Sequence, residues 1–161
     1  MTQQTLGFTL CDWQQAYQQE GLAPAAVLGA LRNELSTDDN AWISLASEVQ
    51  LNEQLAALDE RLQQVEGNVA SLPLYGVPFA VKDNIDAAGW DTTAACPAFA
   101  HQASADATVV ARLRAAGAIL IGKTNLDQFA TGLVGTRSPY GAVSNSFNAD
   151  YVSGGSSSGS A

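Results

Sequence analysis

The sequence has few of the residues on which common catalytic and metal sites depend. Its 161 residues include one histidine, His101, and two cysteines, Cys11 and Cys96, which lie far apart. A disulfide framework or a zinc site needs several cysteines at short spacings, and neither cysteine has a second one nearby. We interpret His101 as a surface or loop residue. Sites built on a Ser-His-Asp triad, a Cys-His pair or clustered histidines are therefore not expected.

Positive charge is also scarce, with seven basic side chains against sixteen acidic ones and a net charge of −9. Residues 1–70 hold ten of the acids and only two of the bases. An acidic chain repels the phosphate backbone, so nucleic acid is not an expected partner. We interpret the acid-rich first part as a solvated helical surface.

Long apolar runs are missing too. No stretch approaches the length of a membrane span, and the opening "MTQQTLGFTL" lacks the basic start and apolar core of a signal peptide. The expectation is a soluble cytoplasmic protein. Apolar residues nonetheless make up 47% of the chain, which favours a packed core over disorder, and the length suits one domain.

The first third of the chain predicts helices. The first covers 12–20, and the second begins at Pro24, which the first helical turn tolerates. The clearest covers 48–66, where Ser47 and Gln50 have the spacing of a capping box. We interpret the apolar stripes of these helices as core contacts. The stripes are Trp13, Ala16 and Tyr17; Val27, Leu28, Leu31 and Leu35; and Leu51, Leu55, Leu58, Leu62 and Val65.

From residue 77 to 133 the expected order is strand, loop, helix, strand, helix. This alternation predicts an α/β fold with parallel pairing in a sheet. Residues 134–155 show no clear period, and long loops in compact domains are usually functional. The predicted elements are a strand over 77–82, a helix over 105–116 capped by Ser104, the β-rich run "AILIGKTN", and a short helix over 125–133 capped by Thr124.

Lys82 follows the apolar stretch "VPFAV" in a chain with few basic residues. A lysine in apolar surroundings loses hydration of its charged form, so its pKa falls and the neutral amine can act as a general base. The alternative is a strand-end lysine that reaches water or pairs with Asp83 or Asp86. The local pattern by itself favours the alternative.

The stretch "SGGSSSGSA" near the end of the sequence also has two interpretations. Its composition is that of a flexible linker. Composition alone favours the linker; the alternative is a backbone-rich loop that carries hydroxyls, because glycines let the main chain approach a ligand. It is not a P-loop, since no lysine accompanies it. Serine with lysine is one way to activate a hydroxyl nucleophile, although Lys82 and Ser156 are far apart in the sequence.

Three motifs together resemble the amidase signature family: "PLYGVPFAVKDNIDAAG", "ATVVARLRAAGAILIGKTNLDQFATG" and "GGSSSGSA". The resemblance covers about residues 72–161. It implies one domain without internal boundary over 1–161, with helices over 1–70 and, over 71–161, the first part of a truncated mixed-sheet α/β/α fold. It implies no metal or organic cofactor. The linker interpretation becomes the minor one.

The resemblance also implies a mechanism, which is amide hydrolysis by a Ser-cisSer-Lys triad. Lys82 matches the family's lysine base, and Ser156 matches the bridging serine, whose preceding peptide bond from Gly155 is cis. Neutral Lys82 would take a proton from Ser156, which takes one from the nucleophilic serine, and an acyl-enzyme forms.

One departure from the family pattern concerns the nucleophile. In the family it lies in a second Gly/Ser-rich segment downstream, together with the oxyanion-hole N–H groups, and Ser157, Ser158 and Ser160 do not match it. We therefore expect this chain to be the N-terminal portion of a longer enzyme and inactive alone. Its expected partners are the remaining part of the amidase domain, a small amide substrate and, for the longer enzyme, a second copy in a homodimer.

Within the family the stretch "NADYVSGGSSSGSA" is most similar to allophanate hydrolases, which act in urea degradation and convert allophanate to ammonia and carbon dioxide. The resemblance implies substrate contacts by Thr131, Gly132 and Gly155. Arg137 is a candidate for binding an anionic substrate and equally a surface residue. Asp127 is interpreted as a capping-type residue of the predicted helix.

Two other hypotheses remain open. One keeps the amidase chemistry with another substrate, as in one component of an amidotransferase or a broad amidase. The other is a non-catalytic amidase-like module that binds a partner. The missing nucleophile and the acidic first part of the chain favour it.

Overall fold

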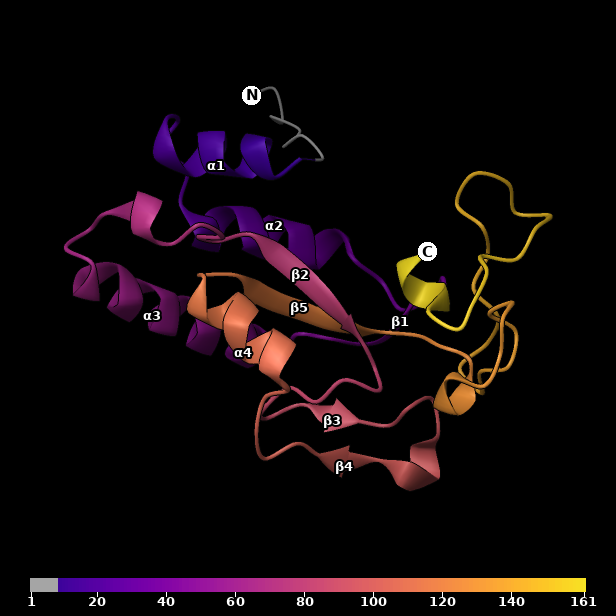
Figure 1. The fold of residues 1–161 in the computed structure, drawn as a ribbon. Coiled ribbons are helices and arrows are strands. Elements are labelled where there is room, and N and C mark those ends of the chain that lie inside the picture. Colours follow the sequence, from indigo (N-terminus) through magenta and orange to yellow (C-terminus); the bar gives the residue numbers. More distant parts are fainter. Residues whose placement is uncertain (1–8) are drawn as a thin grey trace. The chain divides into compact units, whose positions relative to one another are not determined.

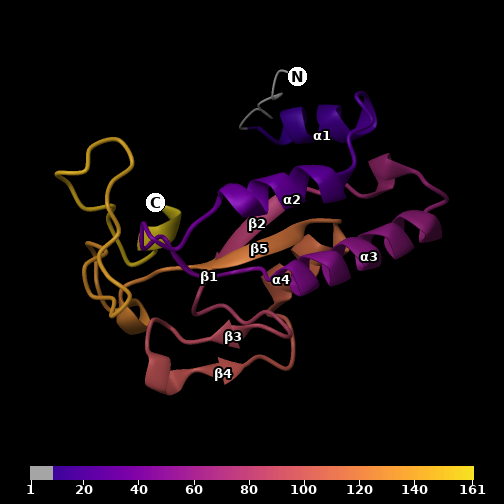
Figure 2. The same cartoon turned by 180° about the vertical axis from the view of Figure 1, so that it is seen from behind.

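The computed structural model describes residues 9–161, which form four helices and five strands within that range (Figures 1 and 2). The predicted α/β class is confirmed. Short 3₁₀ turns occur at Val69–Ser71 (η1), Pro97–Phe99 (η2), Gln128–Ala130 (η3) and Ser158–Ser160 (η4). The helices are α1 (Leu10–Gln18), α2 (Pro24–Glu34), α3 (Glu48–Gln64) and α4 (Thr108–Ala115); the strands are β1 (Trp42–Leu45), β2 (Pro78–Lys82), β3 (Asp91–Thr92), β4 (His101–Gln102) and β5 (Ile119–Thr124).

These elements belong to two compact units, each assembled from three separate stretches of chain. The first unit consists of the described residues up to Glu34, together with Ala46–Phe79 and Arg112–Leu120. The second consists of Leu35–Leu45, Ala80–Ala111 and Ile121–Ala161. The assignment of 1–161 to a single amidase domain stays a prediction.

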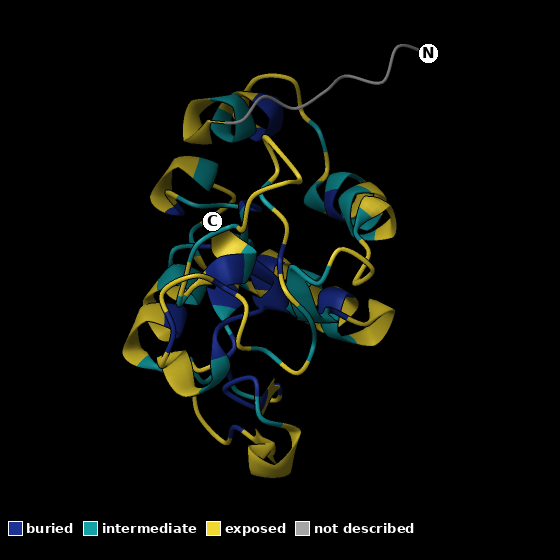
Figure 3. Cartoon of the chain, turned by 90° about the vertical axis from the view of Figure 1, so that its right-hand side faces the viewer, coloured by how far each residue is buried: buried dark blue, intermediate teal, exposed yellow. Residues whose placement is uncertain are grey.

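The main sheet has the strand order β1-β5-β2 (Figure 1). Ile119 N–H donates to Val77 O, and Asp83 N–H donates to Thr124 O, so β2 and β5 run in the same direction as predicted. The sequence did not predict β1, which pairs antiparallel with β5 and makes the sheet mixed. All six residues of β5 are buried, as expected of a central strand. Figure 3 colours the ribbon by the burial of each described residue.

The predicted N-terminal helices are confirmed with small shifts of their ends. Helix α2 begins at Pro24, and α3 begins at Glu48, directly after the predicted cap Ser47. In that box Ser47 Oγ accepts a hydrogen bond from Gln50 N–H, and Gln50 Oε1 accepts one from Ser47 N–H. The leucines Leu51 and Leu58 are buried, so the apolar stripe of α3 packs in the first unit. None of the helices in the described range combines the length and the apolar content that a bilayer span requires.

The capping box makes α3 sensitive to one hydroxyl. We expect Ser47→Ala to lower the free energy of unfolding by about 1 kcal/mol, because the N–H of Gln50 loses its side-chain acceptor. Urea unfolding measures the change. The matched control is Ser71→Ala, at an exposed serine of η1. Equal losses in both variants would contradict the role of the cap.

Two predicted helix starts are wrong. Helix α4 begins at Thr108, four residues after the predicted cap Ser104, because Asp106 turns its carboxylate to another segment. Asp106 Oδ1 accepts a hydrogen bond from Ala88 N–H at 2.7 Å. This long-range bond replaces the local capping interaction that the sequence pattern suggests.

The second wrong start belongs to the predicted helix over 125–133, which is absent. Thr124, its predicted cap, is the buried last residue of β5, and only the 3₁₀ turn η3 follows. Phe129 and Ala130 have φ angles of 51° and 57°, in the left-handed region where a right-handed helix cannot continue. The chain after β5 is therefore a tight irregular loop.

Candidate functional site

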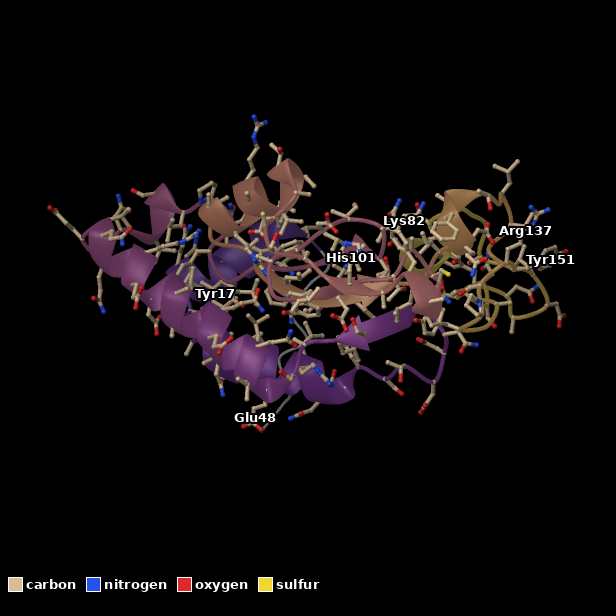
Figure 4. All side chains as sticks on the ribbon, turned by 90° about the horizontal axis from the view of Figure 1, so that it is seen from below. Tyr17, Glu48, Lys82, His101, Arg137 and Tyr151 are labelled. Atoms are coloured by element: carbon tan, nitrogen blue, oxygen red, sulfur yellow. The ribbon has the colours of Figure 1, made fainter. Side chains whose placement is uncertain are left out.

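Lys82 stands at the end of β2, half-buried, and its ammonium Nζ donates a hydrogen bond to Ser156 Oγ at 2.7 Å (Figure 4). The two residues are 74 positions apart in the sequence, and both belong to the second unit. Burial lowers the pKa of Lys82 below its usual value, and the negative charge of Asp127 partly opposes this shift. A lysine with a lowered pKa reaches its neutral, basic form more readily.

The alternative partners of Lys82 are engaged elsewhere. Asp83 pairs with Lys123 at 3.1 Å. Asp86 Oδ1 lies 3.7 Å from His101 Nε2. His101 lies in the exposed strand β4, which confirms the surface position predicted for it. Neither carboxylate neighbouring Lys82 in the sequence is therefore its counterpart.

Ser156 belongs to the segment "SGGSSSGSA", which the sequence allows to be either a linker or an active-site loop. The peptide bond between Gly155 and Ser156 is cis. Ser156 O accepts a hydrogen bond from Asp127 N–H at 3.0 Å, and Gly159 N–H donates to Asn125 O at 3.0 Å. Gly154 has φ +96°. These bonds tie the segment to the chain after β5, so it is not a free linker within this structure.

Asp127 is buried, and its carboxylate does not cap η3. Oδ2 accepts a hydrogen bond from Gly135 N–H at 3.0 Å, and Oδ1 accepts one from Arg137 N–H at 2.8 Å. Burial raises the pKa of Asp127, but backbone N–H groups of Arg137, Gly135 and Val134 outweigh it, so the pKa lies below its usual value. The interpretation of Asp127 as a capping residue of a helix is wrong; it is an ionised anchor for a loop.

Sequence reasoning missed a second lysine. Lys123 is fully buried in β5, where its Nζ contacts Asp83 Oδ1 at 3.1 Å and donates to Asp91 O at 2.9 Å. Asp83 Oδ2 in turn accepts hydrogen bonds from the backbone N–H and the hydroxyl of Thr93. The available signal was a lysine inside the apolar run "AILIGKT", a setting as apolar as that of Lys82.

The predicted substrate-contact residues lie around Asp127. Thr131 is exposed, and its hydroxyl donates to Gln128 O at 2.8 Å. Gly132 is buried, and a Cβ atom at Gly132 or at Gly155 would collide with Asp127 Oδ2. The exposed Arg137 donates from its guanidinium to Thr131 O at 3.3 Å (Figure 4). The glycines have this packing role in the structure, and substrate contact by Thr131, Gly132 and Gly155 stays a prediction.

Chemically, the contact between the Lys82 amine and the Ser156 hydroxyl is suited to proton transfer. Within residues 9–161 no group of three or more His, Cys, Asp or Glu side chains is placed to hold a metal ion. A lysine amine in contact with a serine hydroxyl moves a proton to and from that oxygen. Ser158 is buried, whereas Ser160 is exposed and its Oγ shares a hydrogen bond with Thr124 Oγ1 at 2.8 Å.

The chain is similar to known proteins in sequence and in fold. The chain is 53% identical over 164 residues to urea amidolyase of Lachancea kluyveri, covering all of this chain and 9% of that protein. It superimposes on allophanate hydrolase of Kluyveromyces lactis with a TM-score of 0.86 and 50% identity, covering 96% of this chain and 25% of that one. It is 47% identical over 122 residues to a component of the glutamyl-tRNA(Gln) amidotransferase of Symbiobacterium thermophilum, covering 75% of this chain and 24% of that protein.

The chain thus spans only a small part of the length of the proteins it matches. The resemblance to the amidase signature fold is confirmed by the superposition, in which the chain covers part of that fold. A match to the family described as Amidase extends over residues 30–161, which is most of the chain and includes both Lys82 and Ser156. The chain belongs to the amidase family.

Proposed function

We propose that this chain is part of an enzyme that hydrolyses a small amide or ureido bond, with allophanate as its substrate. The contact between Lys82 Nζ and Ser156 Oγ carries the proposal, since it joins a base of lowered pKa to a hydroxyl. The choice of allophanate is supported by the identity of about half the residues to proteins named urea amidolyase and allophanate hydrolase.

In the proposed mechanism neutral Lys82 accepts the proton of Ser156 Oγ. Ser156 then accepts a proton from the attacking serine, whose oxygen bonds to the carbonyl carbon of the substrate. The tetrahedral intermediate collapses to an acyl-enzyme as the protonated amine leaves. A water molecule, deprotonated through the same relay, attacks the acyl group and releases the acid.

The attacking serine is proposed to lie outside these 161 residues, so that the chain alone is inactive. Burial of Ser158 supports this for that residue, because an attacking hydroxyl must be accessible to the carbonyl carbon. The oxyanion-hole donors are proposed to lie outside them as well.

An amidotransferase-type or broader amidase is the second candidate. It is favoured by the 47% identity to a glutamyl-tRNA(Gln) amidotransferase component over three quarters of the chain. Comparing the hydrolysis of allophanate, glutamine and simple aliphatic amides separates the two candidates. A binding module without catalysis predicts turnover of none of them.

The first test is ammonia release from allophanate by this chain alone and by this chain mixed with a downstream amidase segment of a relative. We expect activity only in the mixture. Ser156→Ala should lower it by about 10²-fold or more, because the relay loses its middle oxygen. Ser146→Ala, at an exposed serine of the same unit, is the control and should leave it unchanged. A mixture that is inactive although both parts are folded would overturn the proposal.

A further inference from the structure

Asp127 is a buried carboxylate of the second unit, and it lies next to Ser156 in the fold. Its two carboxylate oxygens accept N–H bonds from Gly135 and Arg137, at 3.0 and 2.8 Å. Its own N–H donates to Ser156 O at 3.0 Å. One residue thus connects the loop 134–137 with the serine that faces Lys82.

The packing around the carboxylate is too close for side chains. At Gly132 and at Gly155 a Cβ atom would overlap Asp127 Oδ2. Gly135 has φ +78°, and a Cβ there would meet Gly154 O and Ser158 Cβ. Because Gly155 has no side chain, the buried carboxylate of Asp127 lies directly against the backbone that precedes Ser156.

We propose that Asp127 is a positioning residue: its carboxylate binds the loop 134–137 and packs against Gly155, while its own N–H holds Ser156 O, so that Ser156 Oγ stays opposite Lys82 Nζ. The inference that this positioning serves catalysis rests on the proposed function. The hydrogen bonds that carry it exist in the chain itself and are open to measurement without turnover.

The charge of Asp127 has a second effect on the same pair, since it raises the pKa of Lys82 against the effect of burial. The other charged groups around the end of β2 are engaged elsewhere: Asp83 with Lys123, Asp86 beside His101, and Arg137 with Asp127 and Thr131. Removing the carboxylate charge should therefore lower the pKa of Lys82 further. Substituting a residue that acts only through packing should not have this effect.

The test is Asp127→Asn in the 161-residue chain. An asparagine offers one carbonyl oxygen, so its NH₂ group would face one of the two N–H donors that the carboxylate now accepts. Lys82 and Lys123 are the only lysines of the sequence, so ¹⁵N-lysine NMR follows Lys82 directly, with Lys82→Ala for assignment. We expect the titration midpoint of Lys82 to move to lower pH, and residue 127 N–H to exchange faster. Asp150→Asn, at an exposed aspartate of the same unit, should change neither.

A measurement on the unaltered chain covers the case in which Asp127→Asn does not fold. Amide exchange of Gly135 and Arg137 should be slow at neutral pH and should lose protection only below the pH at which ordinary aspartates titrate, because the pKa of Asp127 is lowered. Fast exchange of both amides at neutral pH, or an unchanged Lys82 midpoint in a folded Asp127→Asn chain, overturns the inference. Neither result depends on allophanate hydrolysis, so failure of the proposed function is recognised separately.

Discussion

Lys82→Arg is expected to abolish measurable hydrolysis in the reconstituted mixture, with a loss of about 10²–10⁴-fold. Arginine keeps the positive charge and the length of the side chain but cannot release its proton in a protein. A loss therefore assigns the role of base to Lys82, since a purely electrostatic role would survive the exchange. The measurement is the initial rate of ammonia release at saturating allophanate, with near-UV circular dichroism to verify the fold.

The pH dependence of the unaltered mixture gives the complementary test. Only neutral Lys82 accepts a proton, so activity should fall as pH drops through the pKa of Lys82 and reach its plateau above it. Because burial lowers this pKa, the plateau should begin below the pH that an exposed lysine would require. A Lys82→Arg mixture that keeps more than about a tenth of the rate would contradict the assignment.

Lys123→Met is expected to be the most destabilising single substitution discussed for this chain, with a loss of about 3–5 kcal/mol in the free energy of unfolding. Its ammonium is fully buried, and its removal leaves the buried carboxylate of Asp83 without a counter-charge. Asp83 directly follows Lys82, so the end of β2 should loosen as well. Urea unfolding in matched buffers measures the effect.

Two controls define this result. Arg112→Met removes a cation from an exposed position on α4 and should change stability by less than about 0.5 kcal/mol. Combining Lys123→Met with Asp83→Asn should cost less than the sum of the single losses, because the pair is removed together. Additive losses, or a Lys123→Met chain as stable as the Arg112→Met chain, would show that the ion pair is not coupled.

The sequence indicates the residue types of the site but not which residues contact each other. The residue types of Lys82 and Ser156 suggested a serine–lysine relay, but nothing local joins residues 74 positions apart, so only the resemblance to the amidase signature family paired them. Their contact depends on the parallel pairing of β2 with β5 and on the bond from Asp127 N–H to Ser156 O, which no local spacing encodes.

Lys123 shows where local reasoning fails in the opposite direction. Sequence reasoning weighs Lys82 as a base against a surface lysine and passes over Lys123, although Lys123 is the more deeply buried. The difference lies in the partner. Asp83 directly follows the neighbouring strand β2, and strand neighbours follow from topology rather than from the order of residues.

Asp127 explains the incorrect helix over 125–133. The spacing from Thr124 suits a helix start, and on local propensity the prediction is reasonable. In the structure the carboxylate binds N–H groups eight and ten residues further on. These bonds, with left-handed Phe129 and Ala130, hold the chain in a tight loop instead. The helices α1, α2 and α3, whose signals are local, were predicted correctly in kind.

The alternation of the two units along the chain limits how the protein can be dissected. Lys82 and Ser156 lie in different stretches of the second unit, and Arg112–Leu120 of the first unit comes between them. Any continuous fragment that carries both residues therefore also carries a piece of the first unit. The relay cannot be transplanted as a cassette or isolated by a pair of proteolytic cuts, and a domain-swapping experiment must exchange both units at once.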